Sequence, residues 1–167
     1  LEYTGFDVKG KNEDELKAIC KELHIEVENS MGKGKLIDEI FSAKCESHFI
    51  QPTFIIDYPV EMSPLTKKHR SEEGLVERFE LMINGKEIAN AYTELNDPID
   101  QYERFIDQMK LSEKGDDEAM MIDHDFLRAL EYGMPPTSGI GFGIDRLAML
   151  MTNNLSIQEV LFFPQMR

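Results

Sequence analysis

Several common sources of stability or activity are scarce in this sequence of 167 residues. The only two cysteines, Cys20 and Cys45, have neither the spacing of a zinc site nor that of a disulfide framework. No apolar run is long enough to span a bilayer, and no charged and apolar leader opens the chain. These absences argue against a disulfide-stabilised or membrane-spanning protein and predict a soluble one in a reducing compartment, the cytoplasm.

Positive charge is scarce as well. The chain has 18 lysines and arginines against 32 aspartates and glutamates, which gives a net charge of -14. This balance opposes binding of a nucleic-acid backbone by the chain as a whole. The 41% of hydrophobic residues is enough for the core of one domain. Because the sequence begins at Leu1 rather than at Met and ends just after an apolar run, we expect it to be a piece of a longer protein.

The first third of the chain has helical periodicity. Asn12 and Glu15 form a variant of the capping box, which marks the start of a helix. Two apolar stripes at helical spacing follow and predict two packed helices, the second ending before His48; the stripes are Leu16, Ile19, Cys20 and Leu23, and Leu36, Ile37, Ile40 and Phe41.

Strand patterns occupy the middle of the chain. Residues 53–57 form a β-branched and aromatic run, which predicts a strand buried on both faces. Residues 76–83 alternate, with Phe79, Leu81 and Ile83 on the expected apolar face. Asn84-Gly85 is a strong signal for a type I′ hairpin turn, and the return strand is expected to run from Lys86 to about Glu94.

Further helices are predicted after Asp97, after Asp123 and at the end of a glycine-rich strand in residues 136–152. Hairpins combined with helices predict an α+β fold in a single domain, residues 1–167. No internal repeat or low-complexity linker divides the chain.

Two acidic residues flank the predicted hairpin turn. In an ideal two-residue hairpin Met82 pairs with Glu87 and Glu80 with Ala89, so Glu80 and Glu87 become diagonal neighbours on one face. Two carboxylates so close repel each other unless a positive charge lies between them. Hard carboxylate oxygens without a histidine are ligands that suit Mg²⁺. The alternative is a solvated sheet face on which Glu80 pairs with Arg78 or a lysine.

Asn90, Tyr92 and Glu94 follow at strand spacing and share a face. In an ideal hairpin that face lies opposite the side chain of Glu87, so one pocket containing all four residues requires a β-bulge or sharp twist between Glu87 and Asn90. The alternative is an edge strand that carries polar residues against aggregation.

Gly139, Gly141 and Gly143 alternate in the segment SGIGFGID, which lacks the spacing of a dinucleotide fingerprint. Alternating glycines leave one face of a strand without side chains, so a flat ligand can lie against the backbone. Arg146 then falls in the first turn of a helix, where a guanidinium can meet a phosphate or an adenine. Close helix-strand packing with a surface arginine is the alternative.

These segments carry a family resemblance. The stretches GIGFGIDRLAMLMT and SIQEVLFFPQMR resemble motif three of the class II aminoacyl-tRNA synthetases. The stretches QPTFIIDYPVEMSPL and RFELMINGKEIANAYTELNDPIDQYERF resemble the lysyl-tRNA synthetase version. The match covers nearly all of the chain from Gly34 onward. Residues 1–48 fit a helical insertion, and residues 49–167 correspond to the sheet, the substrate-binding strands and motif three.

The resemblance implies ATP-dependent activation of L-lysine to lysyl-adenylate, followed by transfer to tRNA(Lys). By position, Glu80 and Glu87 match the Mg²⁺ ligands, and Arg146 matches the arginine that stacks on adenine and approaches the γ-phosphate. Asn90, Tyr92 and Glu94 match substrate-binding residues, with Glu94 facing the lysine ε-ammonium; Tyr92 stands where the family often has Phe. The expected ATP-binding set is Glu80, Glu87, Gly139, Gly141, Gly143 and Arg146.

Other parts of the family pattern are not in this sequence. Motif one, which forms the dimer interface, motif two and the anticodon-binding barrel do not appear. We therefore expect the carboxy-terminal part of a catalytic domain, inactive alone, whose full-length enzyme is a homodimer and binds tRNA.

The rival interpretations are a ligase that attaches lysine to elongation factor P and a non-catalytic module derived from a synthetase. Gly141 favours the lysine-tRNA enzyme, since the ligase that acts on elongation factor P tends to carry alanine at that position. Glu94 favours it as well, since aspartyl and asparaginyl synthetases typically carry a basic residue near that position. If the chain is part of the lysine-tRNA enzyme, Glu80, Glu87 and Glu94 are expected to converge with Arg146 around a common cavity.

Overall fold

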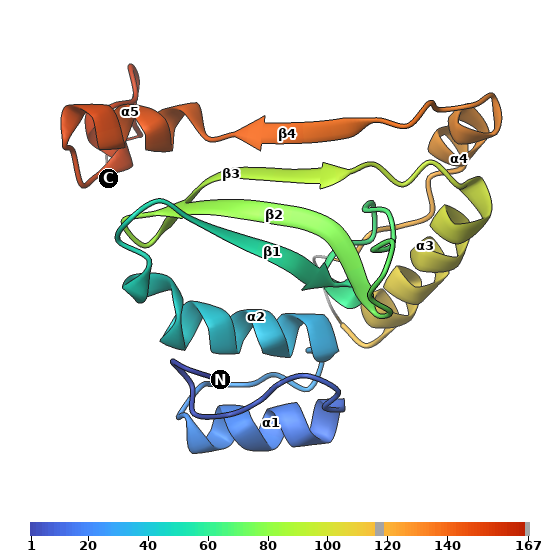
Figure 1. The fold of residues 1–167 in the computed structure, drawn as a ribbon, viewed down its shortest axis with the longest axis horizontal. Helices are drawn as coiled ribbons and strands as arrows, with labels where there is room; N and C mark the ends of the chain where they lie inside the picture. The colour runs from blue at the N-terminus through green and yellow to red at the C-terminus, as the bar shows by residue number, and fades with distance from the viewer. Residues whose placement is uncertain (116–118, 166–167) are drawn as a thin grey trace.

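An antiparallel sheet forms the centre of the molecule in the computed structural model, which describes residues 1–115 and 119–165 (Figure 1). Its strands are β1 (Thr53–Pro59), β2 (Leu75–Ile83), β3 (Lys86–Thr93) and β4 (Ser138–Phe142), and they lie in the order β1-β2-β3-β4. Together with the helices described below, this sheet confirms the predicted α+β class.

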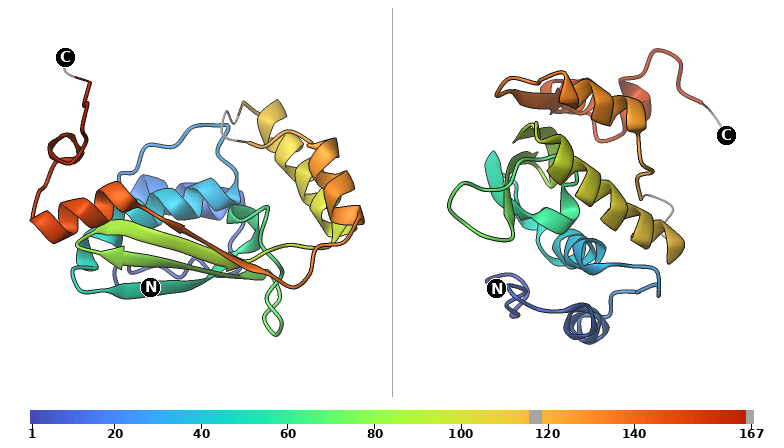
Figure 2. Two further views of the ribbon diagram at one scale, coloured as in Figure 1. Left: turned by 90° about the horizontal axis from the view of Figure 1, so that it is seen from above. Right: turned by 90° about the vertical axis from the view of Figure 1, so that its right-hand side faces the viewer.

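Helices cover one side of this sheet. They are α1 (Glu13–Glu22), α2 (Lys33–Lys44), α3 (Pro98–Glu113), α4 (His124–Glu131) and α5 (Ile144–Thr152), with short 3₁₀ turns η1 (Glu46–His48), η2 (Val60–Met62) and η3 (Ile157–Glu159). The left-hand view of Figure 2 shows α1 to α4 on the same side of the strands, while α5 extends past the end of the sheet. Among the described residues, no helix has the length and apolarity needed to cross a membrane.

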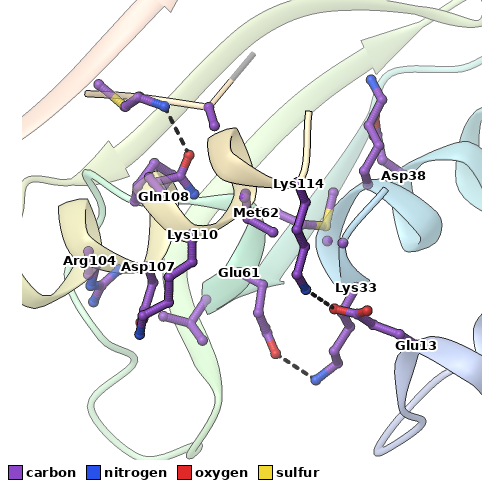
Figure 3. A pocket seen from close by; sticks show the side chains of 18 of the residues that line it. Glu13, Lys33, Asp38, Glu61, Met62, Arg104, Asp107, Gln108, Lys110 and Lys114 are labelled. Atoms are coloured by element: carbon purple, nitrogen blue, oxygen red, sulfur yellow. Dashed lines mark hydrogen bonds and ion pairs between the residues drawn. The ribbon is translucent and has the colours of Figure 1, made fainter. Parts of the chain in front are cut away.

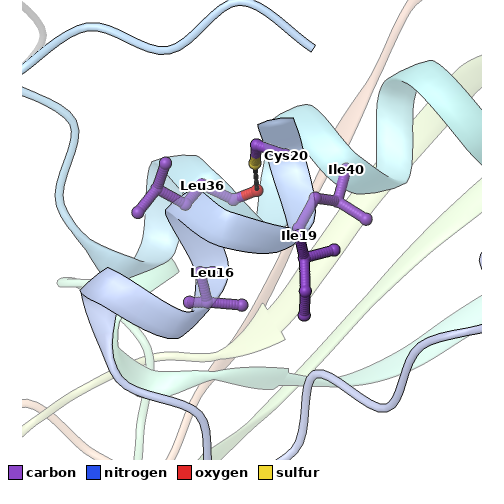
Figure 4. Close-up of a cluster of buried hydrophobic side chains, with 5 residues drawn as sticks. All are labelled: Leu16, Ile19, Cys20, Leu36 and Ile40. Carbon is purple, nitrogen blue, oxygen red and sulfur yellow. Dashed lines mark hydrogen bonds between the residues drawn. The ribbon is translucent and has the colours of Figure 1, made fainter. Parts of the chain in front are cut away.

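The first two helices have a small hydrophobic core of their own. Asn12 and Glu15 form the predicted capping box at the start of α1. Buried side chains of α1 pack against those of α2, as Figure 4 shows; they are Leu16, Ile19 and Cys20, and Leu36 and Ile40. The apolar stripes of the sequence thus correctly predicted which faces of the two helices meet.

The turn between β2 and β3 is the predicted hairpin. Asn84 has φ 53° and Gly85 has φ 67°, the positive values that a type I′ turn requires at both central positions. This turn places β2 and β3 side by side and sets the end of the hairpin at which Glu87 lies.

The prediction that residues 53–57 are buried on both faces is wrong. Phe54 is 59% exposed and Ile56 is 61% exposed, because β1 is an edge strand and no helix of residues 1–115 and 119–165 covers this face of the sheet. The expected core face of β2 is also reversed: Val76 and Met82 are buried on the side that the helices cover.

Two rows of apolar residues cross all four strands on the uncovered side, which we call the apolar sheet face. By strand register, one row is Phe54, Leu81, Ala89 and Phe142, and the other is Ile56, Phe79, Ala91 and Ile140. The side chains of the two edge strands are exposed in both rows, whereas Ala89 and Ala91 between them are buried. Exposed apolar surface promotes association.

The apolar sheet face predicts concentration-dependent association of the isolated 167-residue chain. The substitution Ile56→Lys should shift the chain toward the monomer, since a charge on the exposed edge of the face opposes burial against a second molecule. Size-exclusion chromatography with light scattering measures this shift. The control is Ile99→Lys on α3, where the side chain is 72% exposed outside the face; an equal shift for both variants contradicts the prediction.

Candidate active site

Polar side chains of β2 and β3 form two rows on the helix-covered side of the sheet. In the first row Glu80 pairs with Asn90, which pairs with Gly141 of β4. In the second row Arg78 pairs with Tyr92, which pairs with Gly139. Side chains directly opposite each other in antiparallel strands share a face. The two glycines therefore place no side chain of β4 beside Asn90 and Tyr92.

A β-bulge in β3 brings Glu87 onto the same face. Leu81 pairs with Ala89 and Met82 pairs with Glu87, so Ile88 is the extra residue. The predicted bulge between Glu87 and Asn90 is confirmed. Because of it, Glu80 pairs with Asn90 rather than with Ala89, as an ideal hairpin predicts. Glu87 now shares a face with both Glu80 and Asn90.

The start of α5 is attached to this bulge. The backbone N–H of Gly143 donates a hydrogen bond of 2.9 Å to the carbonyl of Ile88. Arg146, in the first turn of α5, donates from Nη1 to the carbonyl of Glu87 at 2.7 Å, and the same nitrogen lies 3.6 Å from Oε2 of Glu87. The structure therefore brings Arg146 and Glu87 together, both partly open to solvent.

Glu94 lies at the other end of the row, just past the end of β3. Its N–H donates to the carbonyl of Thr137 at 3.0 Å, and it forms an isolated bridge with Thr66. Burial raises the pKa of its carboxyl. The negative charge of Glu94 in turn contributes to the raised pKa of Tyr92, whose largest cause is burial. Tyr92 thus links Glu94 to the rest of the row.

Two cavities border these rows. The larger, of about 600 Å³, lies between α2, η2, α3 and β2 and has Arg78 and Glu80 in its wall. Figure 3 shows ion pairs at its rim, Lys33 with Glu61 at 2.6 Å and Lys114 with Glu13 at 4.0 Å. The smaller, of about 540 Å³, includes Tyr92 and Gly139 but follows one row of the apolar sheet face, Ile56, Phe79, Ala91 and Ile140. The predicted residues that line neither of these two cavities are Glu87, Asn90, Glu94, Gly141, Gly143 and Arg146. The acidic residues share a sheet face but do not line either cavity together.

The close approach of α2 to η2 limits the larger cavity on one side. Gly34 of α2 is buried, and a Cβ built at this position would lie 3.0 Å from the carbonyl oxygen of Glu61. Helix and turn meet backbone to backbone at this point.

Arg78 is a central residue of the site. From the sequence it was expected only as an alternative ion-pair partner of Glu80. Its guanidinium donates to the Glu80 carboxylate, to Oδ1 of Asn90 at 3.2 Å, and to Met62 O and Ser63 Oγ at 3.0 and 2.8 Å. It also lies 4.4 Å from the ring centroid of Tyr58. The signal in the sequence was its position two residues before Glu80, on the same face of β2.

The ion pair of Arg78 and Glu80 does not neutralise the neighbouring Glu87. Burial raises the pKa of Glu87, the charge of Glu80 raises it further, and the charges of Arg146 and Arg78 lower it only in part. Among the described residues no three His, Cys, Asp or Glu side chains come together as a metal-binding group. The two carboxylates on one face correspond to the smaller number of protein ligands that Mg²⁺ takes when water and phosphate complete its shell.

Comparison with known proteins agrees with this architecture. Residues 7–167 match the family model described as tRNA synthetases class II (D, K and N), and the chain belongs to this family. The resemblance expected from the sequence motifs is confirmed.

Several curated relatives are lysine--tRNA ligases. That of Christiangramia forsetii is 71% identical over 167 residues, which is 100% of this chain and 29% of the relative. That of Porphyromonas gingivalis is 70% identical over 166 residues, 99% of this chain and 29% of the relative. That of Azobacteroides pseudotrichonymphae is 67% identical over 166 residues, 99% of this chain and 33% of the relative. The chain therefore spans about a third or less of the length of these relatives.

The raised pKa of Glu87 predicts a pH dependence of stability. The unfolded-state pKa lies near 4.5 and the folded-state pKa above it, so the folded state binds more protons in the interval between them. The free energy of unfolding should fall as the pH rises from 4.5 through this interval. The substitution Glu87→Gln should remove this fall and raise stability at neutral pH, as measured by urea denaturation. Glu131→Gln on the exposed surface of α4 is the control, and a similar gain for it contradicts the prediction.

The Arg78–Glu80 pair predicts a large and coupled stability effect. The side chains are only 15% and 13% exposed, so Arg78→Met leaves a buried carboxylate without its partner. This should lower the free energy of unfolding by about 3–5 kcal/mol. The double variant Arg78→Met, Glu80→Gln should lose less than Arg78→Met alone, because no unpaired charge remains. Strictly additive losses in urea denaturation would show that the pair is not coupled.

Proposed function

We propose that this chain forms the part of a lysine--tRNA ligase that holds Mg²⁺, ATP and the lysine side chain. The observation that carries the proposal is the bulge at Ile88, because it brings Glu87 onto the face of Glu80 and Asn90 and next to Arg146. The sequence identity of about 70% to lysine--tRNA ligases supports the choice of lysine as substrate. Residues 1–48 would then be a helical insertion beside the catalytic sheet.

The reaction has two steps. The carboxylate of L-lysine attacks the α-phosphate of ATP, which forms lysyl-adenylate and releases pyrophosphate. The lysyl group is then transferred from the adenylate to the terminal adenosine of tRNA(Lys). Homodimer formation, tRNA binding and the cytoplasmic location belong to the full-length enzyme in this proposal.

Glu80 and Glu87 would hold Mg²⁺, which would supply positive charge to neutralise the charge that develops on the phosphates of ATP. Both are suitable ligands, since Glu87 retains uncompensated repulsion from Glu80 and the larger cavity gives access to Glu80. Arg78 keeps the Glu80 carboxylate in place through its fixed contacts with Met62 and Ser63.

The other residues of the rows orient the two substrates. Arg146 binds the nucleotide by stacking on adenine and approaching the γ-phosphate, and Gly141 and Gly143 give the nucleotide an open backbone floor. Asn90 contacts the substrate carboxylate or phosphate. Glu94 pairs with the lysine ε-ammonium beside Tyr92, and a charge-assisted pair in a partly buried site strongly rejects neutral side chains.

The test uses the complete synthetase that contains this chain. The substitutions Glu80→Gln and Glu87→Gln should each lower lysine-dependent exchange of pyrophosphate into ATP by about a hundredfold, because phosphate charge is no longer neutralised. Added Mg²⁺ should recover part of the rate. The control is Asp125→Asn, whose side chain is 87% exposed on α4. Exchange at the unaltered rate in both glutamine variants contradicts the proposal.

The acceptor distinguishes the two related ligases. Lysine should appear on the terminal adenosine of tRNA in a charging assay with the complete enzyme. Lysylation of a protein acceptor without charging of tRNA would assign the chain to the related ligase instead. The isolated chain should show no exchange activity.

A further inference from the structure

One of the three alternating glycines has a steric role that the others lack. A Cβ built at Gly139 would lie 2.3 Å from Oε1 and 3.4 Å from Cδ of Glu94. At Gly141 the nearest atom, the carbonyl oxygen of Asn90, lies at 3.8 Å, an ordinary contact. At Gly143 the nearest atoms lie at 3.5 Å. Only at Gly139, among these three, does any side chain collide with a residue of the proposed site.

The backbone of Glu94 is held on both sides, so it cannot move away to relieve such a collision. Its N–H is bonded to Thr137 O at 3.0 Å, and the next residue, Leu95, is 3% exposed and donates to Leu65 O at 3.0 Å. On the side of β3, the carbonyl of Thr93 accepts from Lys67 N at 2.9 Å. A larger residue at position 139 must therefore displace the Glu94 carboxylate rather than the strand.

The Glu94 carboxylate is not paired with a basic group among the described residues. Burial alone accounts for the rise in its pKa, and no basic group among the described residues lowers it. This differs from Glu80, which has Arg78, and from Glu87, which has Arg146. The direction of the Glu94 carboxylate thus depends on the surrounding shape and not on an ion pair within the chain.

We propose that Gly139 is a positioning residue for lysine recognition: its missing side chain leaves the space that the Glu94 carboxylate occupies, and so fixes the place where the ε-ammonium binds. This inference rests on the proposed function. It gives Gly139 a role toward the amino acid, in place of the nucleotide-floor role expected from the sequence, which stays with Gly141 and Gly143.

The substitution Gly139→Ala in the complete synthetase tests this role. In pyrophosphate exchange it should raise the KM for lysine roughly ten- to a hundredfold, because the carboxylate is misplaced by about an ångström, and leave the KM for ATP within about twofold. Ser138→Ala, the neighbouring residue on the opposite face of β4, should change neither value. An equal rise in both KM values, or no rise in the KM for lysine, overturns the proposal.

A second measurement separates this contact from a general loss of fold. Gly139→Ala should change the melting temperature of the complete synthetase little, because the end of the flexible Glu94 side chain moves aside, and it should have equally little effect in a Glu94→Ala background. An equal decrease in both backgrounds overturns the proposal, because the collision then involves another group.

The failure of the proposed function has a different signature. If Glu94→Gln leaves the KM for lysine unchanged, Glu94 does not bind the ammonium and the proposed function fails at this residue. If Glu94→Gln raises the KM for lysine but Gly139→Ala does not, only the positioning role of Gly139 is wrong.

Discussion

A single extra residue in β3, Ile88, controls the arrangement of the candidate site. Without it, the alternation of the strand would place Glu87 on the opposite face from Asn90 and Tyr92. With it, Glu87 joins the face of Glu80, and the carbonyl of Ile88 accepts the hydrogen bond from Gly143 that begins α5. The position of Arg146 against Glu87 follows from that bond. Ile88 is itself 3% exposed, so packing holds the bulge in place.

Charge on this face is balanced unevenly. Arg78 is fixed by several acceptors and by the ring of Tyr58, and it compensates Glu80. Glu87 keeps part of its repulsion from Glu80, and Glu94 lacks a basic partner among the described residues. An arrangement of carboxylates that the chain itself leaves incompletely neutralised is suited to substrates and ions that bring positive charge.

The sequence predicted local features well where one or two residues determine the backbone. Asn84-Gly85 specified the hairpin turn, and the capping residues Asn12 and Asp97 marked helix starts that the structure confirms. A bulge or sharp twist between Glu87 and Asn90 was expected because one pocket containing both residues requires it, and the structure has the bulge. The roles of the side chains in substrate binding remain predictions, since neither the structure nor the comparisons contain a ligand.

Features that depend on distant segments were not predictable from the sequence. The apolar run of β1 has the composition of a buried strand, but exposure depends on what covers the sheet, and no helix in the described part of the chain covers that face. The contacts of Arg78 with Met62 and Ser63 join positions about 15 residues apart along the chain. The specific need for glycine at 139 is visible only when the Glu94 side chain is placed beside it. The Gly141 argument against the related ligase is also weaker than expected, because the structure has room for an alanine there.

The backbone contact between Gly34 and Glu61 gives the helical pair α1 and α2 a defined spacing from the sheet. A methyl group at position 34 would act as a wedge at 3.0 Å from Glu61 O and would tilt the pair outward. Gly34 itself lines the larger cavity, so the room beside Glu80 would change with it. The dimensions of this cavity thus depend on a residue that has no functional group at all.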